Sequence, residues 1–269
     1  MTENTMKRKL GIFIWFGYRL PVQERIHLIR EVGFETVLHW WDDSFIDVDG
    51  LSKEEQADAI RNAGLGIENA HLQDKYINDL WMDSVDGQAA FDKYLSDIDA
   101  LAQSEIPVAV MHVTSGPTPP PLSAIGMKRM QAIIERAQDV NVKIALENVR
   151  NPHILKDIFD SMNSPALGFC YDSGHDYIWS QSPHEILKRY REKLFAVHLH
   201  DNKGLADDHL PAGKGIVNWE TVLAEISKSS YKGSLTLESN SAKIPESRTP
   251  YEHLKIHFEA AKAYFLMNS

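Results

Sequence analysis

Short apolar runs with strand character repeatedly end in a residue that can bind a metal ion or carry a proton. Burying a carboxylate at the end of a strand is costly unless the group is paired or coordinated. Because the pattern recurs through the chain, we expect these strand ends to converge on a single site. The runs and their terminal residues are GIENAH (His71), VAVMH (His112), KIALE (Glu147), GFCYD (Asp172), FAVHLH (His198 and His200) and SLTLE (Glu238).

The alternation of side chains within these runs supports one convergent site. Side chains of a strand point to opposite faces with a period of two, so Glu147 shares its face with Ala145, whereas Ile144 and Leu146 point the other way. The runs that end at Asp172, His198 and Glu238 also place smaller residues on the face of the polar group. Small residues on one face and bulky ones on the other are typical of a crowded barrel interior inside a shell of helices.

The order of the predicted elements indicates one (β/α)₈ TIM barrel that occupies residues 1–269 as a single domain. Strands are predicted at about 10–15, 35–40, 66–71, 107–113, 142–148, 167–172, 194–200 and 233–238. Helical patterns lie between them, at 22–33, 52–64, 91–105, 123–141, 153–163, 182–193, 218–229 and 251–268. The alternative is a doubly wound open sheet, but no glycine-rich phosphate loop follows the first strand. The long connections 72–90, 114–124 and 201–218 all follow strand ends, where a barrel builds its active site.

Composition and charge narrow the function classes. The chain has 269 residues, 43% hydrophobic and 25% charged, as expected for a globular protein. The formal net charge of −10 and the scarcity of Lys and Arg in the strand-end loops argue against a large nucleic-acid footprint. No apolar run is long enough to cross a bilayer, and no signal peptide is apparent. The single cysteine, Cys170, excludes an intrachain disulfide and favours a reducing cytoplasmic setting. Association into a homo-oligomer is left open.

The segment 198–215 is the richest in candidate ligands. Mixed imidazole and carboxylate ligands suit Zn, Mn, Co or Fe(II), and a larger carboxylate share favours Mn or Mg. Asp172 is followed three residues later by His175, and Gly174 between them would let the chain turn so that both face one cavity. The polar residues of the segment are His198, His200, Asp201, Asp207, Asp208 and His209.

Several aromatic residues and one further histidine also follow strand ends. Tryptophan faces pack well on the C–H surfaces of sugars, so these residues either wall a sugar-sized pocket or belong to the core. His39, at the end of the second strand, is open to the same two interpretations. The tryptophans concerned are Trp15, Trp40, Trp81 and Trp179.

Five motifs carry a family resemblance over essentially the whole chain. They are ALEN (145–148), YDSGH (171–175), VHLHDN (197–202), DDHLPAGKG (207–215) and LTLES (235–239). The chain resembles the xylose isomerase-like TIM barrels, a superfamily that includes sugar and sugar phosphate isomerases and epimerases as well as endonuclease IV. In the ketose isomerase and epimerase branch, one divalent metal is held by groups from strands five to eight. The resemblance assigns these positions to Glu147, Asp172, His198 and Glu238.

The resemblance to endonuclease IV adds further candidate ligands. That enzyme uses a trinuclear zinc site, and its additional ligands match His71, His112, His175, Asp207 and His209 here. The resemblance therefore leaves two activities open besides isomerisation: a multinuclear zinc phosphoesterase, and a related lyase such as an inosose dehydratase. A barrel retained as a non-catalytic binding protein is a further alternative.

The favoured hypothesis is a metal-dependent isomerase or epimerase of a keto sugar or sugar phosphate, with a small carbohydrate as its partner and Zn, Mn, Co or Mg as cofactor. The metal would polarise the carbonyl and stabilise an enediolate. As the resemblance implies, Glu147 and Glu238 would remove and return the proton from opposite sides of the substrate. His175 would hydrogen-bond the developing oxyanion.

Overall fold

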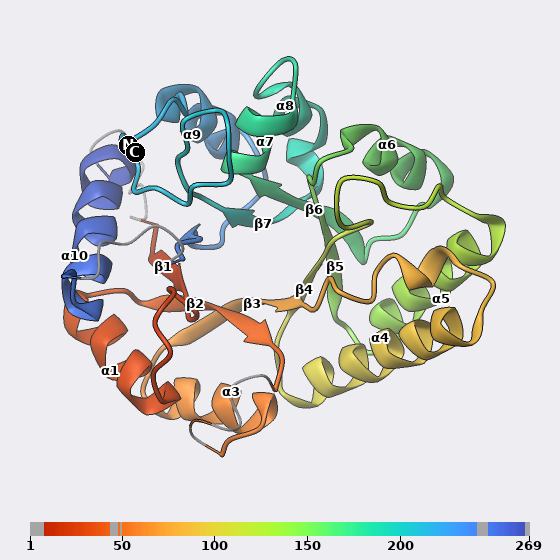
Figure 1. Ribbon diagram of the computed structural model, residues 1–269, viewed down its shortest axis with the longest axis horizontal. Coiled ribbons are helices and arrows are strands. Elements are labelled where there is room, and N and C mark those ends of the chain that lie inside the picture. The colour runs from red at the N-terminus through yellow and green to blue at the C-terminus, as the bar shows by residue number, and fades with distance from the viewer. Residues whose placement is uncertain (1–7, 44–47, 49, 241–246, 267–269) are drawn as a thin grey trace, which may run out of the picture.

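Eight parallel strands form a ring at the centre of the molecule (Figure 1), in the computed structural model that describes residues 8–43, 48, 50–240 and 247–266. The strands follow one another around the ring in chain order, which is the topology that the sequence predicts. They are β1 (Leu10–Phe13), β2 (Thr36–Trp41), β3 (Gly66–Leu72), β4 (Val108–Met111), β5 (Lys143–Glu147), β6 (Leu167–Asp172), β7 (Leu194–His198) and β8 (Leu235–Leu237).

The ring closes where β8 meets both of its neighbours. β8 pairs with β1 in parallel register, with Gly11 opposite Thr236. On the other side, a parallel bridge joins Leu199, just beyond β7, to Leu237. The Leu199 amide donates to the Thr236 carbonyl at 2.9 Å. The strands therefore form a nearly closed TIM barrel, and the open-sheet alternative is wrong.

Helices surround the barrel (Figure 1), and most lie where the sequence predicts them. Two differ: α4 begins at Val85 rather than at residue 91, and the short α7 was not predicted. The helices are α1 (Val22–Val32), α3 (Lys53–Asn62), α4 (Val85–Gln103), α5 (Ala124–Asp139), α6 (Pro152–Ser161), α7 (Ser173–Trp179), α8 (Glu185–Tyr190), α9 (Trp219–Ser227) and α10 (Pro250–Ala261). The 3₁₀ turns η1 (Asp79–Trp81) and η2 (Arg191–Lys193) and the π-helical turn η3 (Lys262–Leu266) complete the described elements.

The two faces of β5 and β6 pack in different layers, as the alternation predicts. Ala145 and Cys170 lie in a small cluster inside the barrel. Ile144 and Leu146 instead join the large apolar layer between the strands and the helices. On β7 the prediction is wrong at Phe195, which packs against the interior cluster rather than with Val197 in the outer layer. Small residues line the interior because an eight-stranded barrel has room for little more than its own side chains. The polar residues at the strand ends continue the inner face and therefore point to the barrel axis.

Local signals explain where the helices begin and end. α1 ends at Gly33, which has a φ of 112°, a left-handed conformation that costs glycine little. α3 begins with a capping box between Ser52 and Glu55, and α10 with one between Thr249 and Glu252. Within the described residues, none of the helices has the length and apolar character needed to cross a bilayer.

Candidate functional site

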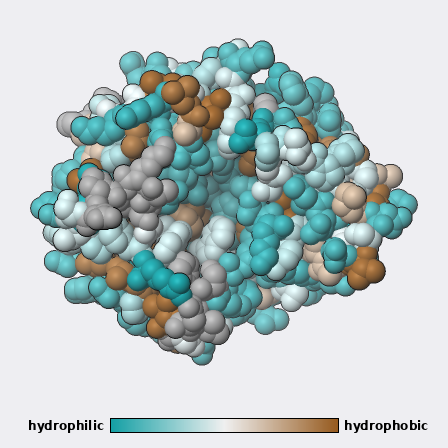
Figure 2. All heavy atoms as spheres, viewed as in Figure 1, coloured by the Kyte–Doolittle hydropathy of each residue, from teal (hydrophilic) through white to brown (hydrophobic). Residues whose placement is uncertain are grey.

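A cavity of about 620 Å³ opens at the carboxyl ends of the strands. Figure 2 shows a hollow at the centre of this face, with mostly hydrophilic residues above it and to its right, over the ring of strands in Figure 1. Residues at the ends of β1, β2, β3 and β5 contribute, together with residues that follow β4, β6, β7 and β8. The lining residues are Phe13, Trp15, Trp40, Asp42, His71, Asp74, His112, Glu147, His175, Asp207, His209, Glu238 and Asn240.

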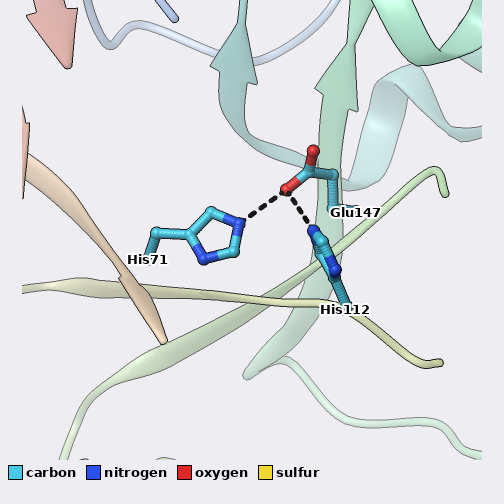
Figure 3. Close-up of side chains that lie close together, drawn as sticks. All are labelled: His71, His112 and Glu147. Carbon is cyan, nitrogen blue, oxygen red and sulfur yellow. Dashed lines mark hydrogen bonds and ion pairs between the residues drawn. The ribbon is translucent and has the colours of Figure 1, made fainter. Parts of the chain in front are cut away.

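Glu147, the last residue of β5, is the centre of the polar cluster. One of its oxygens, Oε2, lies 3.1 Å from Nε2 of His71 on β3. The same oxygen lies 3.5 Å from Nε2 of His112, which follows β4. Figure 3 shows both imidazoles pointing at that oxygen from neighbouring strands. The three side chains place one ligand atom each within 4.8 Å of one another, so they form a candidate metal-binding group.

The same carboxylate belongs to a second candidate group, which adjoins the first. Nδ1 of His198 lies 3.4 Å from Oε2 of Glu147 and 3.3 Å from Oε2 of Glu238. Together with Asp172, these residues bring four ligand atoms within 4.8 Å of one another. The other ring nitrogen of His198, Nε2, faces Oδ1 of the buried Asn69 at 3.4 Å. That contact orients the ring so that Nδ1 points at the carboxylates.

Asp172 is held by backbone groups at the junction of β6 and α7. It is the N-cap of α7, and its Oδ1 accepts the backbone N–H of His175 at 2.6 Å. The side-chain amide of Asn148 brackets the Asp172 backbone, accepting from its N–H and donating to its carbonyl, both at 2.8 Å. Asp172 is fully buried, so its carboxylate forms part of the floor beneath the cavity.

A third set of side chains lies at the rim of the same cluster. Nε2 of His175 is 3.4 Å from Asp207, and Nε2 of His209 is 3.1 Å from the same carboxylate. Nδ1 of His175 lies 3.2 Å from Glu147 and 3.1 Å from the Asn148 carbonyl. Both ring nitrogens of His175 therefore have partners, and a substrate oxygen would reach Nε2 only by displacing Asp207.

Mutual electrostatics keep the carboxylates ionised despite their burial. Burial alone would raise the pKa of Glu147, but the imidazoles of His198, His112 and His175 hold that pKa well below its usual range. Burial likewise opposes ionisation of Glu238, and His198 lowers its pKa. The site is therefore a concentration of negative charge compensated by imidazolium groups.

The imidazoles show the reciprocal effect. Burial lowers the pKa of His112, but Asp74 and Glu147 outweigh it and raise that pKa to about 9. Burial is similarly overcome at His209, where Asp207 raises the pKa to about 9. The protons on these rings balance the negative charge of the carboxylates. A divalent cation would balance that charge in their place, because metal binding displaces protons from its ligands.

The residues present fit a bound divalent metal. Within the part of the chain that the structure describes, Nδ1 of His198 and Oε2 of Glu238 are buried and make no hydrogen bond of ordinary geometry. Buried polar atoms without such a partner are uncommon in folded proteins. A cation between His198, Glu238, Glu147 and Asp172 would satisfy both atoms, and oxygen with imidazole is a ligand set that Zn²⁺ and Mn²⁺ accept.

The structure separates the aromatic residues that reach the cavity from those that do not. Trp15 and Trp40 line it, joined by Phe13, whose ring lies 5.9 Å from that of Trp40 in an edge contact. Trp81 is instead buried, and its indole N–H donates to the Val113 carbonyl. Trp179 packs on the ring of His175 with centroids 4.5 Å apart.

The structure decides between the two interpretations left open for His39 and corrects the interpretation of Gly174. His39 points away from the cavity: Nε2 lies 2.9 Å from the Lys53 carbonyl in the helical layer, and burial lowers its pKa to about 4. Gly174 lies within the helix α7 rather than at a free turn. The reason for a glycine there is space, because a Cβ on Gly174 would come 1.8 Å from the ring of His200.

Comparisons of sequence identify relatives over part of the chain. The chain is 31% identical over 105 residues to protein y4fM of Sinorhizobium fredii, a match that covers 37% of this chain and 34% of that protein. It is 31% identical over 121 residues to protein MJ1311 of Methanocaldococcus jannaschii, covering 41% of each. The matches thus span well under half the length of these curated relatives.

Comparisons of structure extend over nearly the whole chain. A D-tagatose 3-epimerase-like protein aligns with a TM-score of 0.77 and 20% identity, covering 97% of this chain and 98% of that one. D-psicose 3-epimerase from Clostridium cellulolyticum, solved with D-tagatose, aligns at 0.78 with 12% identity, covering 97% and 100%. D-allulose 3-epimerase from Methylomonas, in complex with D-allulose, aligns at 0.75 with 18% identity, covering 96% and 98%. At these identities the likeness establishes the fold.

The family follows from the sequence and the barrel together. The family model described as xylose isomerase-like TIM barrel matches residues 26–259, from α1 through most of α10. This range includes every strand end that contributes to the cavity except that of β1. The chain therefore belongs to the xylose isomerase-like TIM barrel family.

Proposed function

We propose that this protein is a divalent-metal-dependent ketose isomerase or epimerase. The observation that carries the proposal is the gathering of ligand atoms from Glu147, Asp172, His198 and Glu238 within 4.8 Å at the floor of a cavity. The family and the epimerase structures with the same fold support an activity of this class. A bound cation would act as a Lewis acid toward the substrate carbonyl.

The two glutamates are the proposed proton carriers. Glu147 and Glu238 lie at the ends of β5 and β8, and both line the cavity. Each approaches Nδ1 of His198, at 3.4 and 3.3 Å, so both carboxylates border the same small volume. A carbon held there would have one carboxylate to remove its proton and another to return it on the other side. His175 would then hydrogen-bond the substrate oxygen once Asp207 moves aside.

The described lining of the cavity favours an uncharged ketose over a sugar phosphate. Its ionisable groups are carboxylates and imidazoles, with no Lys or Arg among the described lining residues. Asp42, which accepts from the Trp40 indole N–H, and Asp74, which lies 3.5 Å from His112, also line the cavity and would repel a phosphate dianion. Phe13, Trp15 and Trp40 offer faces on which the C–H surface of a sugar can pack.

The test is turnover of defined ketoses. Metal-free protein and protein reloaded with Mn²⁺, Co²⁺ or Zn²⁺ would be incubated with D-tagatose, D-psicose, D-fructose and L-ribulose, and products followed by NMR. The 6-phosphates of the same hexuloses would be tested in parallel as matched phosphorylated substrates. We expect metal-dependent conversion of at least one free ketose. Conversion of phosphates alone would contradict the assigned substrate class, and no conversion in either set would contradict the proposed activity.

A second candidate function has its own supporting observation. His71 and His112 form a further ligand group with Glu147, and His175, Asp207 and His209 lie together beside it. A metal-bridged hydroxide at such a multinuclear site is a nucleophile for phosphoesters. The net charge of −10 disfavours a duplex substrate. We therefore expect no incision of a duplex with an abasic site at physiological salt. Metal-dependent nicking that is lost in His71→Ala would favour the phosphoesterase over the isomerase or epimerase.

A further inference from the structure

His200 is buried beside the candidate metal site and is absent from the lining of the cavity. It follows His198 by two residues, so alternation places its side chain on the same side of the chain. The residue is 1% exposed. Its Nε2 lies 3.2 Å from both carboxylate oxygens of Asp172 and 3.6 Å from Oδ1 of Asp207. The imidazole therefore contacts a proposed metal ligand, and it also belongs to a candidate ligand group with His209 and Glu238, whose ligand atoms lie within 4.8 Å of one another.

The surroundings of His200 are shaped to hold a flat ring in this place. Its backbone N–H donates to Oγ of Ser173 at 2.9 Å, and that hydroxyl donates to the His200 carbonyl at 2.8 Å. One face of the ring stacks on His209, with centroids 4.1 Å apart and planes 16° apart. At Gly174 there is no side chain, and a Cβ would come within 1.8 Å of Cε1. A slot that only glycine can form indicates that the position of this ring matters.

We propose that His200 is a positioning residue that donates Nε2–H to Asp172 and fixes the orientation of that carboxylate as a metal ligand. The inference rests on the metal site of the proposed function. Asp172 Oδ1 already accepts the His175 backbone N–H, so His200 supplies the second contact that prevents rotation of the carboxylate. Partners of this kind orient metal ligands, and their loss typically weakens metal affinity about 10–100-fold.

Two substitutions remove the contact in different ways. His200→Phe keeps a planar ring in the slot and its stacking on His209, but removes the donor. Gly174→Ala keeps every imidazole and forces the His200 ring away from Asp172. His39→Phe is the matched control, because His39 is an equally buried histidine that belongs to the helical layer. His200→Gln restores an N–H donor on a side chain of similar reach.

The experiment measures Mn²⁺ binding to the full-length variants by electron paramagnetic resonance of the free ion. We expect His200→Phe and Gly174→Ala to raise the Kd for Mn²⁺ about 10–100-fold without changing the number of ions bound, and His200→Gln to recover part of the loss. His39→Phe should bind as the wild type does. An unchanged Kd in His200→Phe would overturn the proposal. Loss of one bound ion would also overturn it, because His200 would then be a ligand itself.

A second readout uses the metal-free protein. Long-range ¹H–¹⁵N correlation spectra of histidine-labelled protein report the tautomer of each ring, and we expect His200 to carry its proton on Nε2. A proton on Nδ1 alone would refute the hydrogen bond. These results are separable from the proposed function: wild-type protein that binds Mn²⁺ but converts no ketose contradicts the activity and leaves the role of His200 intact.

Discussion

Replacing Asp172 by Asn separates the two tasks that the structure gives this side chain. Asp172 is a proposed metal ligand and also the N-cap of α7. Asn caps a helix about as well as Asp, so Asp172→Asn should preserve the N-cap of α7. It removes the charge from a four-residue ligand group, however, and should weaken metal binding by at least about 100-fold.

The magnitude follows from mass action. A metal at 100 times its Kd stabilises the native state by about 2.7 kcal/mol, whereas a metal at its Kd contributes only about 0.4 kcal/mol. At a metal concentration of 100 times the wild-type Kd, the metal should therefore add about 2.3 kcal/mol less to the free energy of unfolding of Asp172→Asn than to that of the wild type. Asp172→Ala should show the same loss and, without metal, should be about 1 kcal/mol less stable than Asp172→Asn, because the cap is gone.

The assay is urea unfolding with chelator and with added metal, for wild type and both variants. Retention of the full metal increment in Asp172→Asn would refute the assignment of Asp172 as a ligand. A metal-free Asp172→Ala protein as stable as Asp172→Asn would refute the capping role.

Three further predictions follow from the same site. The pKa of His112 is about 9 in the folded protein against about 6.5 in the unfolded chain, so its protonation stabilises the metal-free protein fully below pH 6.5 and this contribution is lost as pH rises through 9. Urea unfolding should show a fall in the free energy of unfolding on the order of 3 kcal/mol over this range. A free energy of unfolding that does not change with pH would contradict the pairing of His112 with Asp74 and Glu147. Trp40→Ala should raise KM about tenfold, about 1.4 kcal/mol, with kcat largely retained, and an unchanged KM would exclude Trp40 from the sugar wall. Glu238→Gln should lower kcat by about 10²–10⁴-fold, measured at saturating metal so that weaker binding is not mistaken for lost proton transfer; wild-type kcat would remove Glu238 from the reaction.

Alternation made much of the barrel and its polar strand ends predictable. Glu147 and His198 stand at the ends of runs in which small and bulky residues alternate, and a period of two then fixes the direction in which the polar group points. The strands β5 to β8 lie within a few residues of their predicted positions for the same reason.

Other features were not accessible from local patterns. In TVLHWW both faces of β2 carry large residues, and the pairing with β3 shifts register between Val37 and Leu38, so the sequence could not show that Trp40 rather than His39 faces the cavity. The helix α7 has seven residues, too few for a helical period to appear. Asn69, in the middle of a strand, acquires its role only through a partner 129 positions away, His198.

The most direct test of proton transfer by Glu147 and Glu238 is solvent exchange during turnover. A ketose that the metal-loaded protein converts would be incubated in heavy water, and the product examined by NMR at the carbon next to the carbonyl. We predict that deuterium enters that carbon, and that Glu238→Gln abolishes both its entry and product formation. Conversion to product with no solvent deuterium at that carbon would contradict the account, because the carboxylate that returns the proton to the opposite face does not carry the one that was removed.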